Sequence, residues 1–272
     1  MDLDSKPRAE HVRPEPRPTH LFDRRDLEFD PTAATLGPWG RNALHGGPVA
    51  GLLAHGILSL VDDAELHLAR LTVDMPRAVP ATTLTMTRNV LRTGRRLVLL
   101  QSRLDADGRS VAHATGLLIR PSGEPPGALP QEPASISPLN EATPADVPSE
   151  PVHHANCIGL RRARGGAYWL HIDIPLLRDQ PLHPAERAAI AADWANPAAN
   201  FVAGGISYIN PDITLYLHRP PVGPWIGIGP SQRNSTAGVA VSDCPLTDAI
   251  GVAGRCVAAG MSAGATVNAP GR

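Results

Sequence analysis

The chain has 272 residues, of which 42% are hydrophobic and 19% charged, and its formal net charge is -1. This length is enough for one large domain or two small ones, and the composition is that of an ordinary soluble globular protein. The charge balance leaves no basic surplus for binding nucleic acid or an anionic membrane surface, so neither partner is expected.

The three cysteines of the chain are Cys157, Cys244 and Cys256, and no two of them form a CxxC pair. The sequence therefore indicates neither a disulfide framework nor a cysteine zinc site. The N-terminal segment has no apolar signal region, and the longest apolar stretch, residues 48–61, is shorter than a membrane span. We expect a cytoplasmic protein, and nothing in the sequence implies a metal, nucleotide or flavin cofactor.

Two proline-rich segments divide the chain. Residues 1–20 are charged and rich in proline without periodicity, which is typical of a flexible tail. Residues 121–151 contain nine prolines in 31 positions and favour an extended linker over a packed element. These segments predict an N-terminal domain over residues 21–120 and a C-terminal domain over residues 152–265, followed by a short tail over residues 266–272.

In the first half, a stretch from Val49 to Leu60 is apolar on nearly all sides, which indicates a buried helix. His45, Gly46 and Gly47 precede it, and Pro48 fits a position in its first turn. Candidate strands follow at residues 70–77, 82–91, 96–105 and 110–119. The second half offers an alanine-rich helix at residues 184–195 and strands at 167–174, 206–217, 224–229, 235–242 and 252–260.

The two halves resemble each other. The strand-like segment from Leu71 to Arg77 has a counterpart from Ile213 to Arg219, 142 positions later. The turn Asp105-Ala106-Asp107-Gly108 has a counterpart in Asp248-Ala249-Ile250-Gly251, 143 positions later. Nearly equal offsets in the same order predict an internal duplication. We therefore expect an α+β fold in which each half is a long central helix wrapped by a curved antiparallel β-sheet.

Three segments carry a resemblance to a known family. They are Leu36-Gly37-Pro38-Trp39, the His45-Gly46-Gly47 helix start, and residues 210–221, which end in His218-Arg219-Pro220-Pro221. Together they resemble the type II acyl-CoA thioesterases and their thioesterase-like relatives, over about residues 22–120 and 165–262. The resemblance implies two fused hot-dog domains in one chain.

Thioester hydrolysis needs an activated water and hydrogen-bond donors aimed at the carbonyl oxygen as it gains negative charge. A buried helix that begins with Gly46 and Gly47 offers free backbone N–H groups and a favourable dipole for that oxygen. The alternative is that both glycines only let the helix and the sheet approach closely. We interpret His45 as a turn or capping residue at the helix entry rather than as a base, and we expect it to lie with Gly46 and Gly47 where the substrate or its oxyanion binds.

The resemblance implies a catalytic set of an Asp on the second-domain helix, a Thr or Ser before the His-Arg-Pro strand, and a Gln on the last strand. The acid corresponds to Asp193, whose neighbours on the helix face are apolar, so we expect burial to raise its pKa and make it a base. The Thr position is Asn210, whose amide can still orient a water. The Gln position falls at Ala258 or Ala259, and neither side chain can form a hydrogen bond. For Asp193, the alternative is a helix-end acid that faces water.

Other polar residues have simpler interpretations. We expect Asp212, His218 and Arg219 to serve the turn and strand around them. His153 and His154 fall in or beside the predicted linker, where a metal site is not expected. The cluster Arg92, Arg95 and Arg96 reads as a solvated hairpin turn, with contact to coenzyme A phosphates as the alternative.

The leading hypothesis is a hydrolase for an acyl-CoA or acyl-carrier-protein thioester, in which Asp193 and Asn210 hold the water. The first alternative is a lyase, isomerase or cyclase step on a polyketide- or acyl-derived intermediate, because the family Gln and Thr are replaced. The second is an acyl-binding protein without catalysis. A monomer of two fused domains is geometrically sufficient, and further association into a homodimer stays open.

Overall fold

A computed structural model of the chain describes residues 17–38, 42–124, 126–127, 136–149, 151–202, 205–230 and 232–267. The predicted N-terminal tail therefore lies outside the described residues except for its last four positions. Trp39 of the resemblance motif, residues 125, 128–135 and 150 of the predicted linker, and residues 268–272 of the predicted C-terminal tail lie outside them as well.

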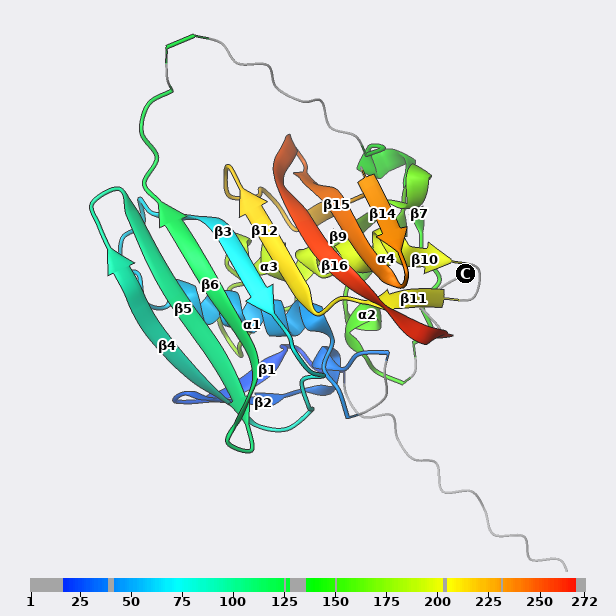
Figure 1. Cartoon of the computed structure of the whole chain (residues 1–272), viewed down its shortest axis with the longest axis horizontal. Coiled ribbons are helices and arrows are strands. Elements are labelled where there is room, and N and C mark those ends of the chain that lie inside the picture. Colours follow the sequence, from blue (N-terminus) through cyan, green and yellow to red (C-terminus); the bar gives the residue numbers. More distant parts are fainter. Residues whose placement is uncertain are drawn as a thin grey trace, which may run out of the picture.

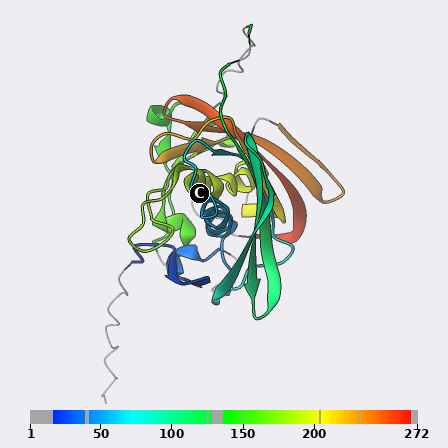
Figure 2. The same cartoon turned by 90° about the vertical axis from the view of Figure 1, so that its left-hand side faces the viewer.

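The described strands form one large antiparallel sheet that curves around the helices (Figures 1 and 2). The first half contributes β1 (Phe22–Arg25), β2 (Glu28–Pro31), β3 (His67–Asp74), β4 (Leu84–Thr93), β5 (Leu97–Ala106) and β6 (Arg109–Ile119). The second half contributes β7 (Thr143–Pro144), β8 (Gly159–Arg162), β9 (Tyr168–His171), β10 (Phe201–Val202), β11 (Gly205–Ile209), β12 (Asp212–Leu217), β13 (Trp225–Ile228), β14 (Gln232–Thr236), β15 (Val239–Asp248) and β16 (Gly251–Val267).

The helices lie inside the curve of the sheet. They are α1 (Gly46–Leu58), α2 (His154–Cys157), α3 (Pro184–Ala192) and α4 (Ala195–Asn200), with short 3-10 turns elsewhere in the described chain. α1 is apolar on nearly all sides because it packs against β5 and β6 on one side and against α3 on the other. Gly51 permits this contact, since a Cβ there would lie 2.7 Å from the side chain of Ile190. Figure 2 shows the blue helix α1 at the centre, with strands curving around it above and on the right.

The four strands predicted for the first half are confirmed, with boundaries shifted by three residues at most. Their alternation is clear in β5, where Val98, Leu100 and Leu104 are buried in the core. In the second half, three predicted elements are each divided. Pro211, which has no N–H to donate, separates β11 from β12. A turn with positive φ at Ala237 and Gly238 separates β14 from β15.

The prediction of one helix over residues 184–195 is wrong at the C-terminal end. α3 stops at Ala192, and α4 begins at Ala195 after the two residues Asp193 and Trp194. The second half therefore has two short helices where a single long one was expected. The position of this interruption matters for function because it leaves Asp193 as the C-cap of α3.

The strand order agrees with the predicted duplication. β3 and β12 are antiparallel neighbours at the middle of the sheet, with Asp74 opposite Asp212 and Leu71 opposite Leu215. β3 is followed outward by β6 and β5, and β12 is followed by β16 and β15. The turns between β5 and β6 and between β15 and β16 are the two turn segments that match in the sequence. The first-half strands β3, β6 and β5 and the second-half strands β12, β16 and β15 thus follow one another outward on the two sides of the β3–β12 pair (Figure 1).

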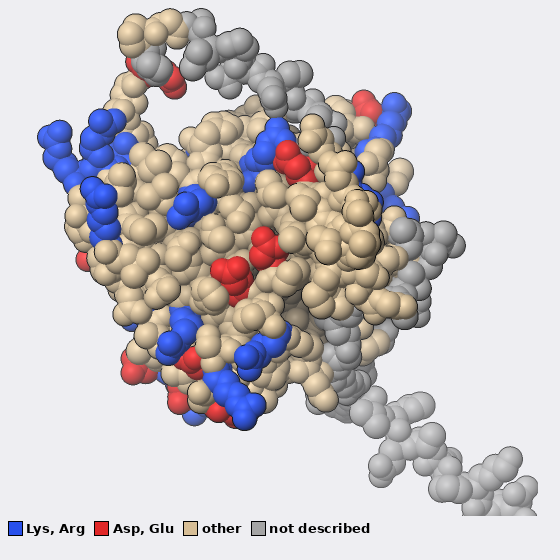
Figure 3. Space-filling view, in the orientation of Figure 1, with Lys and Arg blue, Asp and Glu red and all other residues tan. Residues whose placement is uncertain are grey.

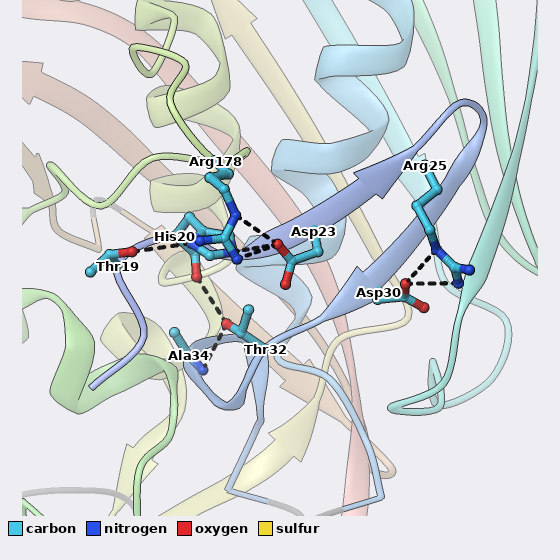
Figure 4. A network of polar contacts seen from close by, with 8 residues as sticks. All are labelled: Thr19, His20, Asp23, Arg25, Asp30, Thr32, Ala34 and Arg178. Carbon is cyan, nitrogen blue, oxygen red and sulfur yellow. Dashed lines mark hydrogen bonds and ion pairs between the residues drawn. The ribbon is translucent and has the colours of Figure 1, made fainter. Parts of the chain in front are cut away.

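The strands at the two ends of the sheet, β1 with β2 and β7, also contact the second half. Within the predicted linker, β7 pairs with β8, which its proline-rich composition did not predict. The β1–β2 hairpin is held by Asp23, which receives hydrogen bonds from Arg178 and contacts His20 (Figure 4). In the part of the chain that the structure describes, no helix is long and apolar enough to cross a membrane.

Candidate active site

The first turn of α1 meets the interruption between α3 and α4. His45 is the N-cap of α1, and its Nδ1 lies 3.1 Å from the backbone nitrogen of Gly47. Gly47 touches α3 so closely that a Cβ there would lie 2.9 Å from the carbonyl oxygen of Ile190. Gly46 lies against Asp193 instead, where a Cβ would lie 2.5 Å from Oδ1. Gly47 therefore serves close packing, and Gly46 gives the carboxylate room at a helix start.

The carboxylate of Asp193 has two side-chain partners. Asn210 donates a hydrogen bond from Nδ2 to Oδ1 at 2.9 Å, and Nδ1 of His45 lies 2.9 Å from Oδ2. The residue is only 6% exposed, so this is not a solvent-facing helix end. The structure thus brings together His45, Gly46, Asp193 and Asn210, although they are scattered over 166 positions of the sequence.

The pKa of Asp193 is lowered, so the expectation of a raised value is wrong. Burial raises the pKa of this carboxyl group, but the facing His45 and the hydrogen bonds from His45 and Asn210 outweigh burial. The start of α1 adds a favourable dipole that opposes the unfavourable end of α3. Asp193 is consequently ionised at neutral pH. Its apolar neighbours on α3 gave no sign of donors arriving from other elements.

Nδ1 of His45 faces two groups that make different demands. The N–H of Gly47 can donate to it only when Nδ1 carries a lone pair, whereas pairing with the Asp193 carboxylate requires a proton on Nδ1. One ring nitrogen cannot serve both groups at once. A proton on Nδ1 therefore pairs His45 with Asp193 and releases the Gly47 N–H from its cap.

A cavity of about 340 Å³ opens beside these residues and is lined by both halves of the chain. Its size falls in the range of small-molecule sites. Much of its wall is apolar, with contributions that include Leu44, Val49, Val79, Ile206 and Ile209. The polar groups on its wall are His45, Gly46, Arg77, Asp193, Asn196 and Asn210. An apolar chain could therefore lie in the cavity with its reactive end near Asp193.

The remaining predicted residues lie outside this cavity. Ala258 is buried, and the backbone N–H of Ala259 donates to Asp212 at 2.8 Å, so neither residue supplies a side-chain group. That contact agrees with a structural role for Asp212, whose pKa is raised by burial and by nearby Asp74. Arg92, Arg95 and Arg96 are exposed at the β4–β5 hairpin and do not line the cavity. Figure 3 shows basic side chains gathered at the upper left, on the side where this hairpin lies in Figure 1.

Three residues lie around the site that the sequence analysis did not predict there. Asn196 is buried on α4 and donates from its side chain to the carbonyl of Tyr208 at 2.8 Å. The rings of His154 and Trp194 lie beside the His45 ring, with centroids 4.8 Å and 5.9 Å away. For Asn196, the only signal was its spacing of three residues from Asp193 in an alanine-rich run. The predicted linker boundary obscured His154.

Within the described residues, no group of three or more His, Cys, Asp or Glu side chains could hold a metal ion. His154 in particular is a buried residue of α2, and its Nδ1 lies 3.2 Å from the carbonyl oxygen of Ala34. That distance fits a neutral imidazole donating from Nδ1. Burial, aided by the proximity of His45, lowers the pKa of His154 from 6.5 to about 3.

His154 should make the free energy of unfolding depend on pH. Its pKa is lower in the folded state than in the unfolded state, so the unfolded chain takes up this proton first as the pH falls. We expect stability to decline from pH 6.5 toward pH 3, with a contribution from His154 of up to about 1.4 kcal/mol per pH unit. Urea denaturation at several pH values should show a flatter dependence for His154→Phe. An unchanged slope would contradict the assignment.

Comparisons with known proteins give the family and the fold. The model of the acyl-CoA thioesterase N-terminal domain matches residues 35–119, and that of the C-terminal domain matches residues 120–261. Among curated proteins, none matches the sequence.

Similar solved structures include a candidate thioesterase from Novosphingobium aromaticivorans, with 20% identity over 89% of this chain and 98% of that chain and a TM-score of 0.68. A hot-dog-fold protein of unknown function from Alicyclobacillus acidocaldarius has 14% identity over 89% and 95%, with a TM-score of 0.61. Acyl-CoA thioesterase II TesB2 from Mycobacterium marinum has 16% identity over 81% and 89%, with a TM-score of 0.60. At such identities these likenesses establish the hot-dog fold alone.

Proposed function

Because the chain belongs to the acyl-CoA thioesterase family, we propose that it hydrolyses an acyl-CoA thioester with a water molecule held by Asp193 and Asn210. The observation that carries the proposal is the meeting of a buried carboxylate, an amide and a glycine helix start on the wall of one cavity. The predicted resemblance to this family is confirmed. The reaction steps below are our proposal for this chain.

Asp193 and Asn210 have the groups needed to hold a water. Each carboxylate oxygen of Asp193 accepts one contact and retains capacity for another. Asn210 uses one N–H toward Asp193, which leaves its second N–H and its carbonyl oxygen. A water between them would be aimed by two neighbouring side chains, and such positioning contributes strongly to rate.

In the proposed reaction, the water oxygen attacks the thioester carbonyl carbon while one of its protons passes to the carboxylate of Asp193, which His45 and Asn210 position. The backbone N–H of Gly46 stabilises the oxygen that gains negative charge, whereas Gly47, which was predicted to share this role, does not line the cavity. The carbon–sulfur bond then breaks, and the proton goes to the departing sulfur, giving a carboxylic acid and a thiol. In this scheme His45 takes the third place that the family Gln occupies elsewhere, since Ala258 and Ala259 offer no side-chain donor.

We also propose that the chain is two hot-dog domains over residues 21–120 and 152–265, joined by residues 121–151. The support is the equivalence of β3 with β12, of β6 with β16 and of β5 with β15 on the two sides of the sheet. The proposed active site needs both domains, because His45 and Gly46 come from the first and Asp193 and Asn210 from the second.

The test is incubation of the protein with acyl-CoA substrates of increasing chain length, followed by thiol titration and mass spectrometry. Equal amounts of free acid and free coenzyme A would support hydrolysis. Conversion of candidate acyl or polyketide intermediates at unchanged oxidation state, without thiol release, would contradict hydrolysis and favour a lyase, isomerase or cyclase. Saturable binding without any turnover would contradict both and favour an acyl-binding protein.

A further inference from the structure

Arg77 and Arg219 hold equivalent positions in the two halves, 142 residues apart. Each follows the central strand of its half, β3 for Arg77 and β12 for Arg219. Arg219 is fully engaged in the fold. Its NH2 group donates to Oδ1 of the buried Asp248 at 2.8 Å and to the carbonyl oxygens of Gly251 and Val252 at 3.0 Å. These hydrogen bonds of Arg219 therefore stabilise the β15–β16 turn.

The first half lacks this arrangement. The acid equivalent to Asp248 is Asp105, and it pairs with Arg103, whose Nε lies 3.1 Å from Oδ2. Arg77 is exposed, and its side chain forms no hydrogen bond or ion pair with any residue in the described part of the chain. The duplicated arginine has thus lost its structural partner in the first half only.

Arg77 lies where a free cation would affect the proposed active site. It lines the same cavity as His45 and Asp193, and it is the only arginine or lysine among the described residues of that wall. The ionised Asp193 makes the cavity unfavourable for an anion, and the net charge of -1 provides no overall attraction. An exposed arginine on the wall supplies that attraction locally.

We propose that Arg77 binds a phosphate group of the coenzyme A portion of the substrate. The proposal rests on the proposed thioesterase function and assigns the carrier end of the substrate to the rim of the cavity. A guanidinium group presents a planar set of donors that matches phosphate oxygens. The acyl portion suits the apolar wall, whereas a phosphate remains in contact with water and reaches an exposed side chain. Arg77 is then a specificity residue that recognises coenzyme A.

The experiment measures affinity by calorimetry, without turnover, for coenzyme A and for pantetheine, which lacks the phosphates. Arg77→Gln should weaken coenzyme A binding about tenfold, as expected for losing a charge-assisted hydrogen bond, and should leave pantetheine unchanged. The coenzyme A affinity of Arg77→Lys should fall between those of the wild type and Arg77→Gln, because lysine keeps the charge without the planar donors. The matched control is Arg95→Gln, an exposed arginine outside the cavity, which should bind coenzyme A like the wild type.

Equal coenzyme A affinities of wild type and Arg77→Gln would overturn the proposal, as would an equal loss for pantetheine. A third arm compares non-hydrolysable thioether analogues of succinyl-pantetheine and acetyl-pantetheine. If Arg77→Gln weakened only the succinyl compound, Arg77 would recognise an acyl carboxylate, and the phosphate assignment would be wrong. Absence of hydrolysis in the wild type would count against the proposed function, whereas these affinities test Arg77 itself.

Discussion

Asp193→Asn is expected to lower kcat for thioester hydrolysis about 10³-fold, within the range that a positioned acid or base contributes. The amide has nearly the same shape as the carboxylate, but it is neutral and cannot take the proton of the attacking water. KM should change little because the cavity wall is preserved. Steady-state kinetics on an acyl-CoA, together with urea denaturation to establish that the variant folds, would measure both effects.

Asp212→Asn is the matched control for this substitution. Asp212 is another partly buried acid of the second half, but it accepts a hydrogen bond from the backbone of Ala259 and does not line the cavity. Its variant should keep kcat within a few-fold of the wild type while losing some stability. Similar losses of kcat in both variants would contradict the assignment of Asp193 as the catalytic base.

The pH profile gives a second check on Asp193. Its pKa is lowered, so the carboxylate stays ionised above its ordinary pKa of 3.8, and this group should produce no acidic limb in kcat between pH 5 and 8. A base with the raised pKa suggested by its apolar helix neighbours would instead lose activity as the pH falls toward that value. A limb near neutral pH that disappears in Asp193→Asn would contradict the hydrogen-bonded, ionised carboxylate.

The sequence predicted the first half well because its signals are local. Alternating apolar residues and clear turns defined β3 to β6, and the apolar stretch after Pro48 defined α1. The second half departs from these rules at two points. Asp193 and Trp194 interrupt an alanine-rich helix although neither is a strong helix breaker, and β7 forms in a proline-rich segment. The first has a local cause that the prediction missed, because Pro197 in the first turn of α4 has no N–H to donate to the carbonyl oxygen of Asp193. The second depends on the pairing of β7 with β8, which no local pattern reports.

The site was predictable only to the extent that the family resemblance pointed to it. That resemblance singled out Asp193, Asn210 and the glycine helix start, which the structure places together. Residue pattern alone could not show that His45 would reach Asp193 from the other half of the chain and reverse the direction of its pKa shift. The unpaired side chain of Arg77 was also hidden, because the sequence does not show that Asp105 pairs with Arg103. The repeat offset of 142 was the only hint, since it identifies Arg219 as the position to compare.

Gly46→Ala is expected to lower kcat about 10²-fold, because displacing a catalytic group by about 1 Å costs roughly that much. The new Cβ would lie 2.5 Å from Oδ1 and 2.8 Å from Cγ of Asp193, so the carboxylate must move. Its hydrogen bond with Asn210 and its pairing with His45 would be strained together. The crowding should also cost about 1–3 kcal/mol in the free energy of unfolding. Kinetics and urea denaturation on the same preparation measure both quantities.

Gly56→Ala separates the catalytic effect from the loss of stability. Gly56 is on the same helix, and a Cβ there would lie 2.4 Å from Oγ of Ser102 and 2.6 Å from Sδ of Met86, so it is at least as crowded as Gly46. It is far along α1 from His45 and does not line the cavity. We therefore expect a comparable loss of stability with kcat close to the wild type. If the two variants lost activity in proportion to their stability, the contact between Gly46 and Asp193 would serve only the packing of α1 against α3.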